Sequence, residues 1–354
     1  MKNIFKNLFS KKFIKKILYK NEYSPIVNLN DNIQKRKILD VIGGELNPDK
    51  VFYIIRRYPG TGLFSNLAYV INHIQIANRM GFVPIVDMKN YPTVYNEKKK
   101  IFGTYNSWEY YFEKLNNFDL DEVYKSKNII MTDNKFYRDK EFKNKITSSK
   151  SLLEIARNQI KIKKPKLKTI DFLKKKMFGG KRILGVHHRG TGYKITEYPI
   201  TINQMINIIN EILKKEHYDK IFLVTEDLNN FNALRDYFGK KIIFLKNSQR
   251  GVSNLDVWKK YSRNLHRYKL GRDILYETFL LSYCDGYFDI ETNPTEFAHA
   301  MNLNPNQKRY TFNNGINKPW YFFKYLNYSW YIKKSLPENF GGFKKNQKPK
   351  KIHE

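Results

Sequence analysis

A candidate phosphate clamp lies at residues 185–193, GVHHRGTGY, where an apolar strand ends and a loop with two histidines, one arginine and two glycines begins. The planar guanidinium of Arg189 can hold two phosphate oxygens with parallel hydrogen bonds. His187 and His188 can each donate or accept a further hydrogen bond. The stretch therefore predicts an anion site at the end of a strand, with a satisfied core histidine as the ordinary alternative.

A second candidate anion site lies in the stretch ETNPTEF, residues 291–297. Asn293 can cap a helix whose first turn holds Pro294, Thr295 and a glutamate, which is a capping-box spacing with proline at the first helical position. Backbone amides at such a helix start, with the Thr292 and Thr295 hydroxyls nearby, can bind an anion. Arg189 can face this helix from a neighbouring strand, so the two stretches together could clamp a diphosphate without a metal.

The elements that must position these residues alternate between strands and helices, which predicts an α/β fold with parallel sheets. In the first half, an apolar strand at 51–57 leads through the glycine loop PGTG into a helix at 63–80 and a strand at 82–88. The second half is predicted to hold strands at 182–187, 220–225, 241–245 and 286–290, and helices at 201–215, 229–239 and 273–284. Thr201 is the expected N-cap of the first of these helices, and Gly239 is expected to close the second.

Ligands of open α/β sheets bind beyond the carboxyl ends of the strands. Polar residues follow several of the predicted strands, so we expect them to share one rim: His187, His188 and Arg189; Thr225, Glu226 and Asp227; residues 246–250; and residues 289–295. The alternative for Glu226 and Asp227 is that they start a helix, where the dipole favours carboxylates. PGTG alone is an incomplete glycine fingerprint and could be only a turn. Residues 160–178 are rich in lysine and show no apolar period, which predicts a linker.

The charge of the chain points to a polyanionic partner. Its 354 residues carry a formal net charge of +32, which suits nucleic acid, an anionic membrane face or phosphate-bearing substrates. AT-rich codon usage accounts for part of the lysine excess. One cysteine, Cys284, excludes an intrachain disulfide framework and fits a reducing compartment. No apolar run is long enough to span a bilayer, and lysines interrupt the N-terminus where a secretory signal would be apolar.

Both ends of the chain are rich in lysine. In residues 1–20, apolar side chains recur at helical spacing between seven lysines. This pattern predicts a helix that lies in an anionic membrane interface, with packing against the body of the protein as the alternative. Residues 343–354 have no apolar period and are predicted to form a disordered, charged tail.

Residues 186–191, VHHRGT, resemble the His-x-Arg-x-Thr-Asp signature of the GDP-fucose-dependent fucosyltransferases. The resemblance is greatest to the α1,6 branch, which includes the Nod-factor enzymes, and to bacterial surface-polysaccharide proteins with an HxRGTDY variant. Glu197 lies ten places after His187, as an acidic residue does in the α1,6 enzymes. Further similar stretches are LVTED at 223–227, LLSYCDGYF at 280–288 and GTGLFSNLAYV at 60–70.

The resemblance implies a GT-B-like α/β fold, in which two Rossmann-like domains with parallel sheets face a cleft, and a metal-independent, inverting transfer of fucose from GDP-fucose. It implies Arg189 and Glu197 as catalytic residues, the second as general base. The donor-binding residues that it implies are His187, Gly190, Thr191, Thr225, Asp227, Thr292, Asn293, Thr295, Gly62 and Asn66.

Four segments follow from this comparison: a basic amphipathic segment at 1–40, an acceptor-side domain at 41–170, a nucleotide-sugar domain at 171–317, and an aromatic segment with a basic tail at 318–354. The aromatic stretch IFGTYNSWEYYFEKL, residues 101–115, could be a stacking platform for an acceptor sugar or ordinary core.

The predicted activity is transfer of fucose to a glycan hydroxyl during the synthesis of a bacterial surface polysaccharide or lipopolysaccharide. The enzyme would work at the cytoplasmic face of the inner membrane, where the basic N-terminus would hold it near a lipid-linked acceptor. Alternatives are another GDP-sugar as donor, a nonenzymatic polyanion binder, and a catalytically degenerate transferase. Gly192 in place of the family aspartate, and DIETNPT in place of a glycine- and serine-bearing loop, motivate the last alternative. Nucleic acid is a disfavoured partner because no recognised binding motif occurs.

Overall fold

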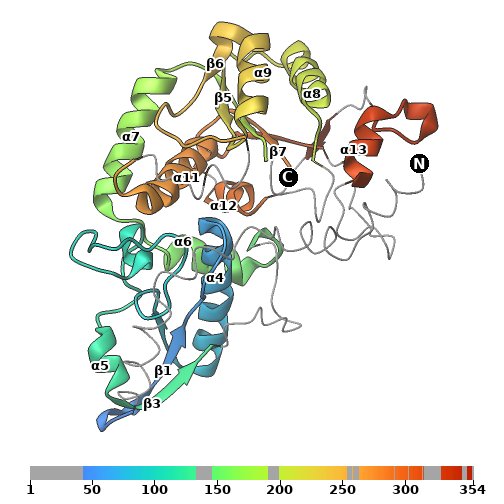
Figure 1. Ribbon diagram of the computed structural model, residues 1–354. Coiled ribbons are helices and arrows are strands. Elements are labelled where there is room, and N and C mark those ends of the chain that lie inside the picture. Colours follow the sequence, from blue (N-terminus) through green and yellow to red (C-terminus); the bar gives the residue numbers. More distant parts are fainter. Residues whose placement is uncertain are drawn as a thin grey trace.

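Two parallel sheets organise the chain, one in each half (Figure 1). The computed structural model describes residues 43–132, 146–189, 199–252, 257, 263–290, 292–301, 303–312, 314, 328–344 and 349–352. We call the elements from β1 to α6 the N-terminal lobe and those from α7 to β9 the C-terminal lobe. The α/β class expected from the sequence is confirmed.

The N-terminal lobe is built on β1 (Leu46–Ile55), which pairs in parallel with β2 (Val83–Val86) on one side and β3 (Ser126–Met131) on the other. The second half of β1 is buried without alternation, as a central parallel strand should be. Helix α4 (Leu63–Met80) returns the chain from β1 to β2 within its predicted bounds, and Gly81 ends it in the left-handed conformation.

The rest of this lobe consists of short elements: η2 (Ser107–Tyr110), α5 (Leu120–Tyr124), η3 (Ile146–Ser148) and α6 (Lys150–Asn158). Strand β3 was not predicted. In the aromatic stretch, Trp108, Tyr110 and Tyr111 are at most 3% exposed. These three rings belong to the core and do not offer an open stacking face.

The C-terminal lobe holds six strands in the order β6-β5-β4-β7-β8-β9. They are β6 (Ile242–Ile243), β5 (Lys220–Val224), β4 (Ile183–His187), β7 (Gly286–Asp289), β8 (Lys308–Thr311) and β9 (Lys350–Ile352). All neighbouring pairs are parallel except β8 and β9, which are antiparallel. The four predicted strands are present, although β6 is shorter than expected, and β8 and β9 were not predicted.

Helices cover this second sheet: α7 (Lys164–Phe178), α8 (Ile202–Lys215), α9 (Leu228–Phe238), α11 (His266–Ser282), α12 (Asn293–Met301) and α13 (Tyr328–Ser335), with the short helices η5 (Gly239–Lys241) and η6 (Glu338–Phe340). The expected N-cap of α8 is confirmed, because the Thr201 side chain accepts from the Gln204 backbone and Gln204 returns the bond. Gly239 closes α9 as predicted.

The linker predicted at 160–178 is wrong, because most of it is helix α7. Ile170 and Phe178 bury one side of this helix, Pro165 stands in its first turn, and Gly179 caps its end in the left-handed conformation. Lys166 is buried with them, whereas Lys164, Lys168, Lys175 and Lys176 are exposed, so the high charge hid the helical period.

The largest apolar cluster of the molecule joins the two lobes. Phe64 of α4 packs on Phe297 of α12 with ring centroids 5.1 Å apart, and Figure 1 shows the upper end of α4 next to α12. Polar contacts reinforce the junction, because the Tyr111 hydroxyl donates to the Tyr268 carbonyl at 2.9 Å. The lobes therefore share a core around the space between them.

The predicted amphipathic segment at 1–40 lies outside the described residues, as do residues 318–327 of the predicted C-terminal segment. Of the helices that the structure describes, none combines the length and the apolar character needed to cross a bilayer.

Candidate functional site

A pocket with a volume of about 350 Å³ opens between the two lobes, where strands β4 and β5 end. The N-terminal lobe lines it with residues 61–65, at the start of α4, and with Tyr95. The C-terminal lobe contributes the two strand ends, the first turn of α12 and one face of α11. We call this pocket the interlobe cleft. Its place matches the rule that ligands of open α/β sheets bind at the carboxyl ends of the strands.

The structure brings five of the sequence-predicted site residues to this cleft, which are Gly62, His187, Arg189, Thr225 and Asn293. They come from four stretches of chain that are far apart in sequence. Strands β5, β4 and β7 are neighbours in the sheet, so the residues that follow them meet at one edge. The strand ends therefore share one edge, as expected, whereas His188 and Asp227 of the predicted rim do not line the cleft.

His187 is an uncharged hydrogen-bonding group at the end of β4. Its side chain is 3% exposed, and burial together with the nearby charge of Arg189 lowers its pKa to about 3. Its Nδ1 lies 3.4 Å from the Thr292 hydroxyl, which ties the end of β4 to the start of α12. His188 is equally buried and contacts the Ile200 carbonyl, so it is a core residue.

The start of α12 differs by one residue from the predicted cap. The Glu296 amide donates to the Thr292 carbonyl at 2.8 Å, and the Thr292 amide donates to Thr295 Oγ1 at 2.7 Å. Thr292 is therefore the capping residue, and Asn293 is the first residue of the helix. Thr292 and Thr295 are buried and bonded to each other, so they shape the cleft from behind, while Asn293 faces it.

The side chains of two further predicted residues form hydrogen bonds with the backbone. Asp227 caps α9, because its Oδ1 accepts from the Asn230 amide at 3.0 Å. Glu226 lines the cleft instead. Asn66 is 2% exposed and bonds to both the amide and the carbonyl of Thr61, which fixes the glycine loop before α4. The contribution of Asn66 to the cleft is thus to position its neighbours.

The remaining predicted residues, Gly190, Thr191 and Glu197, lie outside the described residues. Within the part of the chain that is described, no three histidine, cysteine, aspartate or glutamate side chains gather as they would around a metal ion.

Two buried carboxylates on α11 were missed by the sequence analysis. Asp273 and Glu277 are 3% and 6% exposed and line the cleft from successive turns of one helix face. Asp273 contacts Arg263 at 2.7 Å, and Glu277 lies 3.8 Å from Arg250. Their four-residue spacing was visible in the sequence, but the helix was interpreted only as an amphipathic core element.

The cleft contains a buried polar atom that lacks a hydrogen-bond partner among the described residues, Thr61 Oγ1, and a polar pair, Ser248 and Glu277, whose side chains interact with each other. Burial raises the pKa of Glu277 to about 7, although the nearby Arg250 opposes this shift. Buried polar atoms are normally bonded, since leaving them unpaired costs free energy. The cleft therefore suits a polar ligand that offers N–H and O–H groups.

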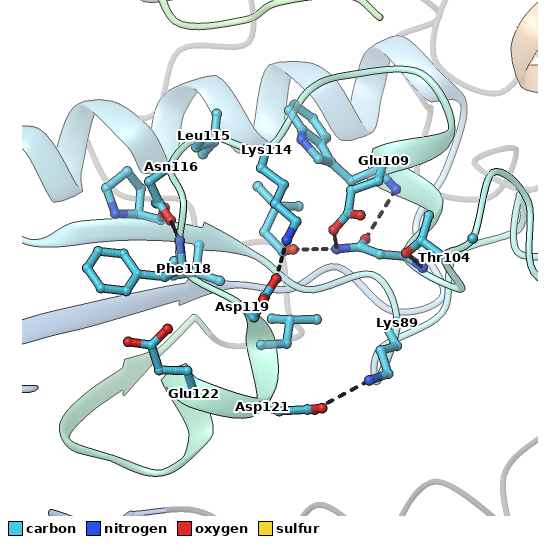
Figure 2. Close-up of a pocket in the computed structure, with 17 residues that line it drawn as sticks. Lys89, Thr104, Glu109, Lys114, Leu115, Asn116, Phe118, Asp119, Asp121 and Glu122 are labelled. Carbon is cyan, nitrogen blue, oxygen red and sulfur yellow. Dashed lines mark hydrogen bonds and ion pairs between the residues drawn. The ribbon is translucent and has the colours of Figure 1, made fainter. Parts of the chain in front are cut away.

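A second pocket, with a volume of about 500 Å³, lies wholly within the N-terminal lobe beside β2 (Figure 2). Its charged side chains pair with one another near the surface: Lys114 points toward Asp119, and Lys89 lies 3.5 Å from Asp121. These pairs are solvent-exposed and contribute little. The interlobe cleft, with its buried and incompletely bonded groups, is the stronger candidate site.

Comparison with solved structures identifies the fold. The chain is similar to the α1,6-fucosyltransferase NodZ co-crystallised with GDP, with a TM-score of 0.50, 15% sequence identity, and coverage of 75% of this chain and 96% of NodZ. A NodZ structure from Bradyrhizobium aligns with a TM-score of 0.49, 16% identity and coverage of 75% and 95%. A FUT1 variant from Arabidopsis thaliana in complex with GDP aligns with a TM-score of 0.42 and 9% sequence identity, over 87% of this chain and 76% of FUT1.

No protein-family model and no curated protein matches the chain. The fold is that of the GT-B fucosyltransferases, as the sequence resemblance implied.

Proposed function

We propose that the chain is a glycosyltransferase that binds a GDP-sugar in the interlobe cleft. The observation that carries this proposal is the meeting of Arg189, the uncharged His187 and the first turn of α12 at one edge of the cleft, opposite the buried carboxylates of α11. The fold of the chain is similar to that of NodZ, which has been co-crystallised with GDP. The donor proposed from the sequence, GDP-fucose, fits this arrangement.

The two sides of the cleft suit the two ends of a nucleoside diphosphate. Arg189 can hold the diphosphate, and its fixed charge would stabilise the negative charge that develops when GDP leaves. Leu270 and Ile274 of α11 offer apolar surface for a planar base beside Glu277. The interacting side chains of Glu277 and Ser248 line this side of the cleft and can accept from the N–H donors of guanine.

The finer assignments follow from the sequence resemblance. Glu197 is proposed as the general base that activates an acceptor hydroxyl. The proposed acceptor is a glycan of a bacterial surface polysaccharide or lipopolysaccharide, free or lipid-linked. The basic segment at 1–40 would hold the enzyme on the cytoplasmic face of the inner membrane.

Thermal stabilisation by nucleotides tests the proposal. We expect GDP and GDP-fucose to raise the melting temperature with and without a chelator, and UDP to have no effect. Ligand at one hundred times its Kd stabilises by about 2.7 kcal/mol. Arg189→Ala should lose this response, whereas Arg235→Ala, on an exposed face of α9, should keep it. A response to no nucleotide, or one that survives in Arg189→Ala, would contradict the proposed site. GDP-mannose in the same series tests another donor sugar.

A catalytically degenerate transferase is the second candidate, because Gly192 stands where the family signature has an aspartate. Stabilisation by GDP without release of GDP from GDP-fucose, across a panel of glycan acceptors, would favour this candidate over an active enzyme.

A further inference from the structure

A basic surface with exposed aromatic rings is formed by α7 and by the neighbouring turn at residues 101–104. Phe172 of α7 is 60% exposed, Phe102 of the turn is 65% exposed, and Leu167 is 38% exposed. Helix α7 and the residues just before the turn carry exposed lysines, and Lys176 Nζ lies 5.7 Å from the centre of the Phe172 ring. These exposed lysines are Lys98, Lys99, Lys100, Lys164, Lys168, Lys175 and Lys176. We call this surface the α7 face. In Figure 1, α7 forms the left edge of the C-terminal lobe.

The exposed side of helix α7 carries lysines and one large aromatic ring. Lys164, Lys168, Phe172 and Lys175 recur at helical spacing on its exposed side, while Ile170 and Phe178 face the core. Six of the 15 residues of α7 are lysines, and Asp171 is its one acidic residue. The exposed side therefore carries a strong positive charge with a large apolar ring in its middle.

The turn beside α7 presents Phe102 outward. Ile101 and Thr104 exchange backbone hydrogen bonds of 2.9 and 3.2 Å, and the two residues between them have positive φ angles, 51° for Phe102 and 81° for Gly103. A left-handed conformation is unfavourable for a bulky residue, and such strain often marks a functional position. Lys166 Nζ lies 4.8 Å from the Phe102 ring and links the turn to the first turn of α7.

We propose that the α7 face docks on an anionic lipid bilayer. Lysines around exposed phenylalanines are the pattern of interfacial membrane binding, in which apolar rings enter the headgroup region and lysines pair with anionic lipids. The surface is a helix side and a projecting turn, which suits a broad, flat partner. Its cations are all lysines, whereas recognition of nucleic-acid phosphates commonly uses the bidentate geometry of arginine. This surface contains no residue of the segment at 1–40, and the inference does not depend on the proposed activity.

Site-specific probes in the full-length chain test the docking directly. Cys284 is the one cysteine of the chain and is fully buried, so a cysteine introduced by Phe102→Cys or Phe172→Cys can be labelled selectively with an environment-sensitive fluorophore. Tyr237→Cys on α9 is the matched control, because Tyr237 is 56% exposed on a different helix. The partners are vesicles of phosphatidylcholine with and without phosphatidylglycerol.

We expect probes at positions 102 and 172 to shift to the blue and to be quenched by brominated lipids only with the anionic vesicles, and to lose both effects at high salt. The probe at position 237 should stay in water. The proposal is overturned if the chain does not bind anionic vesicles, if it binds while both probes stay in water, or if the probes respond to a single-stranded polynucleotide and not to vesicles.

Charge variants give an independent measure. A triple variant with Lys164→Gln, Lys168→Gln and Lys175→Gln should bind anionic vesicles about a hundredfold more weakly, since each lysine near the surface contributes about a fivefold factor. Lys215→Gln, Lys240→Gln and Lys241→Gln remove the same charge elsewhere and should have a small effect. Equal weakening in both triple variants would show that net charge alone drives binding and would contradict a specific face. Both should retain the wild-type melting temperature.

Discussion

At the scale of single residues, the two buried carboxylates of the interlobe cleft differ in how closely arginines approach them. Asp273 lies between Arg263 and Arg272, each at 2.7 Å. Glu277 has Arg250 at 3.8 Å, beyond hydrogen-bond distance. Burial penalises a charge that is not closely paired, so the uncharged form of Glu277 is favoured in the folded protein.

This imbalance predicts a pH dependence of stability. The pKa of Glu277 is about 7 in the folded protein against a usual value of 4.5. Its favourable contribution is therefore complete below pH 4.5 and is lost as the pH rises through about 7. Between pH 5 and pH 8 we expect the wild type to lose about 3 kcal/mol of unfolding free energy relative to Glu277→Gln. Denaturant unfolding of both proteins across this range measures the difference between their free energies of unfolding. The contributions of other titrating groups are the same in both proteins and cancel in this difference. A difference that stays flat would mean that Arg250 keeps Glu277 ionised.

At the scale of elements, α11 connects the cleft to the lobe junction. Its first turns pack on the N-terminal lobe, where the rings of Tyr268 and Tyr111 stack with centroids 5.9 Å apart. Two turns further along, the same helix presents Asp273 and Glu277 to the cleft. The position of α11 against the N-terminal lobe therefore sets the shape of the cleft.

Gly271 tests this coupling. A Cβ added there would lie 2.3 Å from the Tyr111 hydroxyl and 3.0 Å from the Tyr95 ring. Tyr95 lines the cleft and accepts a hydrogen bond from the Leu63 amide. We expect Gly271→Ala to lower stability by about 1–3 kcal/mol and to weaken GDP binding.

Lys269→Ala, two residues earlier on the same helix, is the control for this prediction. Calorimetry and a GDP titration of the two variants measure both effects. If Gly271→Ala is destabilised but binds GDP as tightly as the wild type, the packing of α11 on the N-terminal lobe does not set the shape of the cleft.

At the scale of the whole molecule, the two sheets are distinct but the apolar core between them is shared. The largest cluster contains residues of α4 and α6 from one lobe and of α11 and α12 from the other. Arg157 of α6 adds a 2.6 Å hydrogen bond to the Ala300 carbonyl of α12. Neither lobe can unfold without exposing apolar surface of its neighbour.

We therefore expect one cooperative thermal transition. Phe64→Ala and Phe297→Ala remove rings from opposite sides of the junction, and each should shift this single transition at a cost of about 3–5 kcal/mol. Scanning calorimetry decides the point. Two resolved transitions, with each variant moving a different one, would show that the lobes are independent units.

The elements predicted from sequence are those with strong local signals. Helix α4 has a clean apolar period, and the Thr201 cap of α8 depends on residues three positions apart. Strands β3, β8 and β9 were missed because polar and charged residues interrupt their sequences, SKNIIM, KRYT and KKI. Strand β9 lies in the tail that was expected to be disordered. The lysines of α7 masked its period, and the cap of α12 was displaced by one residue.

The sequence by itself determined the alternation of strands and helices, and with it the edge at which His187, Arg189, Thr225 and Asn293 meet. Parallel strands deliver their carboxyl ends to one rim whatever the packing details, so that edge follows from the order of elements. Only the tertiary structure decided that Asp273 and Glu277 face the same cleft and that the lobes share a core. These features depend on how α11 packs against residues more than 150 positions away, as in the Tyr111–Tyr268 contact, and no local pattern encodes such a contact.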